Sequence, residues 1–558
     1  MSVQYFGNQH VTKELFFQQL VDSPPPIISI DTETISLKEK LPIGFAIAIS
    51  PHEAWWFDCY PESDPEIEML VGLMTNPNIL KVYANVMFDI RVQPLIFQNF
   101  QFDESNIVDI LVMARLLGRT HARVADLAQE IGREAQDAKD MLTEYGAKTM
   151  LELPPEAVSK KCANDAMVTL DLYHHFAPQM DSLGLSPDYL DVERQVIPIL
   201  VDMSQRGLAI NQQSRAIMEK RLEEDRDFYK SKCTELDFNP GSGMQTGYIL
   251  AKRGNFLPFT KGKKQLKTDE DTLELLDDPL VAPILGYKRA NSILTKYLYP
   301  LRDKDRIYTE YGLDTEVGRT KSSNFNMQNI PSLSSKVGVD VRHIFVPDSG
   351  TFTTGDFSQV HLRIIMFFSG DKEMERVYYD GADGGDIHIS TSKKIHKPRP
   401  IAKAVNYIIP YGRDARVLAT KLRTKDIKYC SGLIDDWMDA YPDAAQWLIA
   451  AEKYGLAHGK ALPTLFGRQI AVPEEYTKYG KLDINGMKRK STNYPVLGSD
   501  GEVLKRALIL CSNHSLPLAV QVHDSITCDG DIIFPIEALE SLAPVPTPFE
   551  VDKSAVWK

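Results

Sequence analysis

The chain has 558 residues, of which 43% are hydrophobic and 25% charged, and its formal net charge is −13. A single hydrophobic core stops growing near ~250–300 residues, so this length predicts a folded protein of at least two domains. Six scattered cysteines without a CxxC pair indicate neither a zinc site nor a disulfide framework, and without a signal peptide or membrane-spanning run we expect a cytoplasmic protein.

Residues 27–170 alternate short apolar runs with amphipathic stretches, which predicts an α/β sheet domain. Asp31 and Glu33 end the first apolar run, IISI, in the order Asp-Thr-Glu. Side chains alternate along a strand, so both carboxylates should lie on one face, where two hard anions favour a divalent cation. An Asp-x-Glu pair also arises by chance in a chain with 76 acidic residues.

Two further acids strengthen the case for a metal site in this region. Asp89 comes after another predicted strand end, and Asp165 lies in the segment 162–169, which we expect to open a helix. With Asp31 and Glu33, they resemble the carboxylates of the DEDD exonuclease superfamily. That resemblance implies a site of two metal ions, which activate water and stabilise the phosphate of a 3′-terminal nucleotide.

The sequence departs from that superfamily at Lys161. Members attached to polymerases usually carry a tyrosine four residues before the last aspartate, where it helps to position the attacking water. With a lysine at this position we still expect the acids to bind metal. Proofreading is the weaker expectation, because the residue that helps to position the water differs.

Residues 187–300 change to long segments with a helical period, joined by a loop rich in glycine, proline and lysine. Lysine and arginine gather at 252–267, 393–403, 421–428 and 488–490, with few acids inside each cluster. A solvated loop explains any one cluster, but four together favour a polyanionic partner despite the negative net charge.

From residue 300 onward, strands and helices mix again. Asp356 follows the strand-like run TFTTG and precedes a helix, and His523 and Asp524 fall at the tip of a predicted hairpin, 517–530. An aspartate in a hairpin turn commonly serves local hydrogen bonds, so Asp524 alone is weak evidence for catalysis.

Between these two aspartates, residues 399–409 predict a helix that Pro410 ends or kinks. Arg399, Lys403 and Tyr407 are four residues apart and should share one helical face. Two cations and an aromatic ring suit a triphosphate and a base or sugar. The alternative is a solvated basic face with Tyr407 packed on the core.

Together these segments resemble motifs A, B and C of family A DNA polymerases, the DNA polymerase I family. The match runs from Asp31 to Trp557 in the family's order and includes further segments: 318–319, 326–331, 342–347, 386–388, 464–468, Arg489 and 493–495. The resemblance implies a ribonuclease-H-like exonuclease domain at 1–186, followed by a right-hand polymerase domain at 187–558. Within the polymerase domain, it implies a thumb at 187–300, a palm at 301–370 and 485–558, and fingers at 371–484.

The resemblance also implies template-directed DNA synthesis with two Mg²⁺ ions per active site, Mn²⁺ being an alternative, at Asp356 and Asp524. Its substrate-binding residues would be Arg399, Lys403, Tyr407, Tyr411, His388, His361 and Gln359. Its DNA-binding residues would be Arg319, Asn326, Gln328, Arg489, Asn493 and His523. The expected partners are primer-template DNA, deoxynucleoside triphosphates and possibly a processivity factor, for a monomeric enzyme.

Four positions of the polymerase region depart from the family. His361 replaces a glutamate that excludes a 2′-hydroxyl, and we expect it to fill that gate by its bulk. Tyr407 replaces a phenylalanine of many relatives and should favour dideoxynucleotides. Ser525 and Leu497 replace a glutamate and a glutamine, and we expect altered rate or fidelity with activity retained.

Two other functions compete with this interpretation. A stand-alone exonuclease with a nucleic-acid-binding C-terminal half leaves Asp356, Arg399, Lys403 and Asp524 without a purpose. A non-catalytic descendant of a polymerase should have lost at least one of them. Because no 5′-nuclease region precedes the exonuclease region, we expect an enzyme of phage DNA replication.

Overall fold

The computed structural model describes residues 3–7, 13–36, 40–59, 65–96, 106–121, 123–185, 187–234, 237–260, 265–331, 338–477 and 480–558. It divides into two compact units, Met1–Asp202 with Tyr311–Lys321 and Met203–Glu310 with Ser322–Lys558. The domain limits expected from the sequence stay predictions. No helix in the described ranges is long and apolar enough to cross a membrane.

The first unit contains a mixed sheet of six strands in the order β1-β4-β3-β2-β5-β6. The strands are β1 (Val3–Phe6), β2 (Ile27–Thr34), β3 (Pro42–Ser50), β4 (Glu53–Asp58), β5 (Leu80–Tyr83) and β6 (Ile107–Asp109). β2 pairs antiparallel with β3 and parallel with β5. Ile28, Ile30, Phe45 and Val82 are fully buried, so the α/β sheet domain predicted from the sequence is confirmed.

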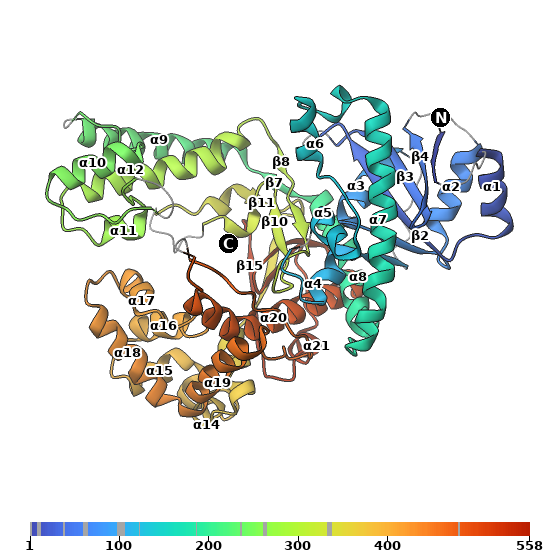
Figure 1. The fold of residues 1–558 in the computed structure, drawn as a ribbon. Helices are drawn as coiled ribbons and strands as arrows, with labels where there is room; N and C mark the ends of the chain where they lie inside the picture. Colours follow the sequence, from blue (N-terminus) through green and yellow to red (C-terminus); the bar gives the residue numbers. More distant parts are fainter. Residues whose placement is uncertain are drawn as a thin grey trace. The chain divides into compact units, whose positions relative to one another are not determined.

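The helices of this unit are α1 (Lys13–Asp22), α2 (Pro65–Thr75), α3 (Val86–Ile96), α4 (Ile110–Leu116), α5 (Val124–Ala128), α6 (Ala138–Tyr145), α7 (Pro155–Ser182) and most of α8 (Pro187–Arg206). Figure 1 shows α7 alongside β2, β3 and β4, which it contacts. The expectation that Asp165 opens a helix was wrong, because α7 begins at Pro155 and Asp165 lies inside it. Proline fits the first turn, where its missing N–H group has no intrahelical partner.

The second unit begins with the predicted helical region. It comprises β7 (Leu208–Ile210), α9 (Gln212–Thr234), α10 (Gly243–Lys252), α11 (Glu270–Glu274) and α12 (Val281–Ile293). A local core of Cys233, Leu250, Leu273 and Ile284 joins these helices, which appear in green in Figure 1. Residues 261–264 of the basic cluster 252–267 lie outside the described residues.

Small sheets connect this helical region to the rest of the unit. β7 pairs with β11 (Phe345–Val346) and β8 (Arg306–Ile307). β9 (Glu310–Gly312) and β10 (Lys321–Ser323) form a two-stranded ribbon, and residues 311–321 are counted with the first unit.

The second unit contains an antiparallel sheet in the order β13-β14-β12-β15. Its strands are β12 (Phe352–Phe357), β13 (Leu518–Val522), β14 (Ser525–Asp529) and β15 (Phe549–Ser554). The register sets Asp356 opposite Ser525. Gly355 is required beneath β15, because a Cβ atom there would lie 2.1 Å from the Phe549 ring. The strand and the hairpin predicted from the sequence are confirmed.

Helices make up most of the remaining second unit (Figure 1). They are α13 (Val360–Ser369), α14 (Lys372–Tyr378), α15 (Ile387–Lys394), α16 (Arg399–Ile408), α17 (Ala415–Leu422), α18 (Ile427–Ala440), α19 (Pro442–His458), α20 (Ile484–Asn513) and α21 (Ile536–Glu540). The predicted helix at 399–409 is confirmed, and it ends before Pro410 as expected.

Candidate active sites

A carboxylate cluster forms in the first unit from three secondary-structure elements. β2 carries Asp31 and Glu33 on one face, and their oxygens lie within 4.8 Å of each other and of the Cys162 sulfur. Asp89 lies in the first turn of α3, beyond the end of β5, and Asp165 lies on α7. Electrostatic coupling of Asp31 to both Asp89 and Asp165 indicates that the four acids share one site.

Lys161 lies inside this cluster. Its Nζ atom is 2.6 Å from Glu33 Oε1 and 2.8 Å from Asp165 Oδ2, and its side chain is only 11% exposed. Burial opposes its charge, but Glu33, Asp165 and Asp31 outweigh that effect and hold the pKa of Lys161 above its usual range. The lysine that the sequence marks as a departure is therefore a charged member of the site.

Burial sets the electrostatics of the carboxylates. It raises the pKa of Asp31 to about 8 and that of Asp89 well above its ordinary value. The Oδ1 atoms of Asp89 and Asp165 are buried and have no hydrogen-bond partner in the described part of the chain. Such oxygens, crowded by like charges, fit a divalent cation of the Mg²⁺ or Mn²⁺ type.

Asp109, which sequence reasoning missed, positions α3 and with it Asp89. Its carboxylate accepts hydrogen bonds from the backbone N–H groups of Asn85, Val86 and Leu111, at 3.2, 2.9 and 2.8 Å. It thereby caps the starts of α3 and α4. Its position at the end of an apolar strand, as for Asp31, is the signal that could have identified it.

A cavity of about 620 Å³ opens beside Lys161 and Asp165, and Arg133, Tyr145 and Asn164 also line it. Cavities of ~300–1,000 Å³ commonly accept small ligands. The cluster therefore combines an acidic, cation-binding floor with space for a nucleotide.

A second pair of carboxylates lies on the antiparallel sheet of the other unit. Asp356 ends β12, and Asp524 lies in the tight turn between β13 and β14, where its carbonyl oxygen accepts a hydrogen bond from Phe357 N–H at 3.3 Å. Strand pairing sets Asp356 opposite Ser525, the residue after Asp524, and the charges of the two carboxyl groups act on each other. The structure thus brings together two aspartates that are far apart in sequence.

The same pair is electrostatically strained. Burial, with contributions from Glu550 and Asp500, raises the pKa of Asp356 to about 6. Burial and the charges of Asp356 and Asp500 raise the pKa of Asp524 to about 7. Asp356 is exposed and Asp524 is half-buried, so these two neighbouring carboxylates, whose charges repel each other, are open to a divalent cation.

Asp500, on α20, is a site residue that sequence reasoning missed. Its side chain is 3% exposed, and its Oδ2 lies 3.5 Å from His361 Nε2. The other ring nitrogen of His361 lies 3.4 Å from the Tyr411 hydroxyl. Asp500 follows Asn493 by seven residues on α20, and this spacing places both on one face of the helix.

Two predicted DNA-binding residues, Gln328 and His523, are linked through Gln521 at the hairpin tip. Gln328 Nε2 donates to Gln521 Oε1 at 3.0 Å, and Gln521 Nε2 donates to the His523 carbonyl oxygen at 2.7 Å. Gln521 is fully buried. Gln328 and His523 therefore belong to the same assembly as Asp524.

The exposed face of α16 carries the predicted triphosphate-binding residues. Arg399 forms an ion pair with Asp386 at 2.6 Å, and Lys403 and Tyr407 are exposed. Tyr407 stacks on Tyr411, with ring centroids 5.5 Å apart. The alternative of Tyr407 packed on the core was wrong, because its side chain is 59% exposed.

Lys421, the first residue of the basic cluster 421–428, completes this face. Lys421 Nζ lies 3.2 Å from the centre of the Tyr407 ring. Burial and the charge of Lys403 lower the pKa of Lys421 to about 8. The face therefore concentrates positive charge beside an aromatic ring.

His388 is oriented by a buried chain of hydrogen bonds. Trp437 Nε1, which can only donate, lies 2.7 Å from Asn406 Oδ1, so the Asn406 Nδ2 group must face His388 Nδ1, 2.8 Å away. His388 Nδ1 is thus the acceptor, and the ring carries its proton on Nε2. Burial, with Arg399 and Lys403, lowers the pKa of His388 to about 4, so the ring is neutral near pH 7.

The remaining predicted residues have mixed surroundings. Gln359 Oε1 accepts from the Tyr378 hydroxyl at 3.2 Å, and Asn326 Oδ1 caps the short helix Met327–Asn329. Arg489 lies against Gly412, and a Cβ atom added to Gly412 would be 3.0 Å from the Cβ atom of Arg489. The Asn493 Oδ1 atom is buried, with no partner among residues the structure describes.

Arg319 differs from the other predicted DNA-binding residues. It lies in the segment 311–321, which is counted with the first unit, and its carbonyl oxygen accepts from the Thr315 hydroxyl at 2.6 Å. Its predicted role stays a prediction.

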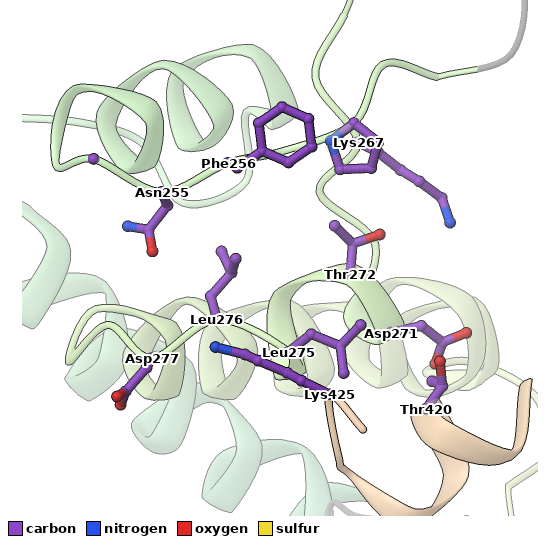
Figure 2. A pocket seen from close by; sticks show the side chains of 12 residues that line it. Asn255, Phe256, Lys267, Asp271, Thr272, Leu275, Leu276, Asp277, Thr420 and Lys425 are labelled. Atoms are coloured by element: carbon purple, nitrogen blue, oxygen red, sulfur yellow. The ribbon is translucent and has the colours of Figure 1, made fainter. Parts of the chain in front are cut away.

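A further cavity of about 620 Å³ lies in the second unit and is lined by residues from 254–258 and 267–277 together with Thr420 and Lys425. Figure 2 shows Phe256 on one side of it and Leu276 on the opposite side. None of the predicted catalytic residues lines it.

Comparison with known proteins agrees with this division of the chain. A model of DNA polymerase family A matches residues 209–532, and a model of a 3′-5′ exonuclease matches residues 9–181. DNA polymerase I of Chloroflexus aurantiacus is 26% identical over 90% of this chain and 57% of that protein. DNA polymerase I of Pseudomonas aeruginosa is 25% identical over 90% of this chain and 59% of that protein. The chain thus spans less than two thirds of either relative.

A solved structure shows the same fold. It is the POL domain of Pol1 from M. smegmatis in complex with DNA primer-template and dNTP, with a TM-score of 0.80 and 19% sequence identity. The match covers 97% of this chain and 98% of that chain. The expected fold, an exonuclease domain followed by a polymerase domain, is confirmed.

Proposed function

The chain belongs to DNA polymerase family A, and we propose that it extends a DNA primer along a template and removes nucleotides from the primer 3′ end. The observation that supports the polymerase activity best is that strand pairing sets Asp356 opposite Ser525 and therefore beside Asp524. His361 acts electrostatically on Asp524 and contacts Tyr411, which links these carboxylates to the end of the basic face of α16.

We propose that Asp356 and Asp524 hold Mg²⁺, two ions as the resemblance implies. Metal bound there would favour ionisation of the primer 3′-hydroxyl and neutralise charge on the phosphate. In the first unit, Asp31, Glu33, Asp89 and Asp165 would supply the oxygens for divalent ions, and Lys161 lies among them.

The protein's own groups would orient the incoming nucleotide. Arg399 and Lys403 present cations to the triphosphate, and the Nε2–H of His388 donates to a phosphate oxygen. Tyr407 and Tyr411 offer a stacked pair of rings for sugar and base, with Gln359 and His361 at the start of the adjoining helix. Primer and template would contact Arg319, Asn326, Gln328, Arg489, Asn493 and His523.

The proposal includes a monomeric enzyme that acts on primer-template DNA and deoxynucleoside triphosphates, with a processivity factor as a further possible partner. It is tested with a 5′-labelled primer on a longer template and Mg²⁺, with and without deoxynucleotides. Extension with nucleotides and shortening without them support both activities. Shortening alone favours the stand-alone exonuclease and excludes the polymerase, whereas extension alone excludes proofreading.

Tyr407→Phe tests the nucleotide face. By the family resemblance, the Tyr407 hydroxyl replaces the contact that a dideoxynucleotide lacks. We expect the wild type to accept dideoxynucleotides readily, and the variant to discriminate against them about tenfold more, the effect of one hydrogen bond. Single-nucleotide incorporation rates measure both; rejection of terminators by the wild type, with no change in the variant, contradicts the assignment.

His361→Ala tests the sugar gate. The imidazole lies between Asp500 and Tyr411, at 3.5 and 3.4 Å, and its removal should open space at the sugar. Ribonucleotide incorporation relative to deoxynucleotide incorporation should rise about 10- to 200-fold, the usual worth of a lost packing contact. A wild type that already incorporates both at similar rates contradicts a gate at this position.

A further inference from the structure

The carboxylate cluster of the first unit already contains a cation of its own. Lys161 Nζ bonds Glu33 Oε1 at 2.6 Å and Asp165 Oδ2 at 2.8 Å. The side chains of all three residues are largely buried, at 11%, 8% and 13% exposure. A buried charge must be paired, and here each of two carboxylates is paired with the same ammonium group.

The secondary structure fixes this arrangement. Lys161 and Asp165 are four residues apart on α7, so their side chains lie one above the other on the same helical face. α7 packs against β2, which carries Glu33. The ammonium group therefore bridges two elements at the positions that their packing dictates.

An ammonium group and a metal ion compete for this place. Mg²⁺ requires oxygens at ~2.0–2.1 Å in octahedral geometry, whereas Lys161 keeps Glu33 Oε1 and Asp165 Oδ2 around its own nitrogen and leaves Glu33 Oε2 on the side of Asp31. The ammonium group of Lys161 also supplies part of the positive charge that the clustered carboxylates need. Asp31 and Asp89, by contrast, have no ion pair with Lys161 at these distances in the described residues.

We propose that Lys161 is a built-in cation that takes the place of one divalent ion, so that the exonuclease site binds a single divalent ion at Asp31, Glu33 and Asp89. This inference rests on the proposed exonuclease function and concerns how that site is charged. Lys161 bridges Glu33 and Asp165 at every metal concentration, and Asp165 serves to hold the lysine.

The test counts Mn²⁺ ions bound to the full chain, by the loss of free Mn²⁺ signal in electron paramagnetic resonance. Asp356→Asn and Asp524→Asn remove the polymerase site from the count. We expect this background to bind one Mn²⁺, which Asp31→Asn abolishes. Adding Lys161→Met, which keeps length and removes charge, should add a second ion and tighten overall binding at least about tenfold.

Matched variants separate charge from structure. Lys161→Arg keeps the charge and should still bind one ion, and Lys160→Met, at the neighbouring exposed lysine, should change nothing. If Lys161→Met unfolds in the absence of metal, the double variant Glu33→Gln with Lys161→Met removes a carboxylate together with its partner. It should fold and bind no more than one ion, and a second ion there overturns the proposal.

Two outcomes overturn the inference directly. One is a background that already binds two Mn²⁺ ions in the first unit, and the other is an unchanged count and affinity after Lys161→Met. Primer shortening by the wild type, measured separately, decides the proposed function. If the wild type shortens primers but Lys161→Met leaves the Mn²⁺ count unchanged, only the proposed role of the lysine is rejected. If Lys161→Met gains an ion but the wild type does not shorten primers, only the proposed proofreading is rejected.

Discussion

Asp524→Asn is expected to reduce primer extension about a thousandfold, equivalent to about 4 kcal/mol of transition-state stabilisation. Asparagine keeps the size of the side chain in the turn between β13 and β14 but removes the charge that would hold metal. Primer shortening should persist, because its carboxylates lie in the other unit. A labelled primer assayed with and without deoxynucleotides measures both activities in one gel.

Asp552→Asn is the control for this variant. Asp552 lies on β15 of the same sheet, is exposed, and pairs with Lys558 at 2.9 Å. It should extend primers like the wild type. Combining Asp524→Asn with Asp356→Asn should cost little more than either change alone, because groups that act as a unit are not additive. Extension by Asp524→Asn within about tenfold of wild type would exclude a catalytic role.

Local patterns predicted the elements that carry the sites. Strand alternation placed Asp31 and Glu33 on one face, and the hairpin pattern placed Asp524 at a turn; both are confirmed. These features depend on residues within a few positions of each other, over which the periodicity of the backbone decides which way each side chain points. The expected helix start around Asp165 was wrong by about two turns, because α7 begins at Pro155, where a proline fits the first helical turn.

Partners from distant segments could not be predicted. The basic clusters contain few acids, yet Lys393 pairs with Asp383 at 2.5 Å and Lys490 with Glu475 at 2.5 Å. Part of the apparent polyanion-binding charge is therefore neutralised within the fold. The Lys161–Glu33 contact joins residues 128 positions apart, and only the packing of α7 on the sheet reveals it.

Asn406→Asp is expected to weaken nucleotide binding at alkaline pH, and the binding should recover as the pH falls. Asn406 donates to His388 Nδ1 and thereby keeps the His388 proton on Nε2. An aspartate accepts instead, so the ring must place a proton on Nδ1 and lose the Nε2–H donor unless it becomes charged. KM for the nucleotide should rise roughly 10²-fold at alkaline pH, the cost of one lost donor to a phosphate.

The pH dependence has a definite sign. In the wild type, the His388 pKa of about 4 keeps the ring neutral above about pH 5, so its Nε2–H donor is present throughout. In the variant, a carboxylate beside the ring raises the pKa of His388. Below that pKa both nitrogens carry protons, and the Nε2–H donor returns as pH falls; above it the donor is lost.

Trp437→Phe distinguishes orientation from charge. It removes the shorter of two hydrogen bonds to Asn406 Oδ1 and leaves the one from the Thr391 hydroxyl at 3.1 Å, so the amide is held less firmly. KM should rise less than in Asn406→Asp and without recovery at low pH. ¹⁵N chemical shifts of the His388 ring report the protonated nitrogen in each protein without any activity measurement. A wild-type ring protonated on Nδ1, or an Asn406→Asp variant whose KM is unchanged at alkaline pH, would show that the buried chain serves stability and not the nucleotide.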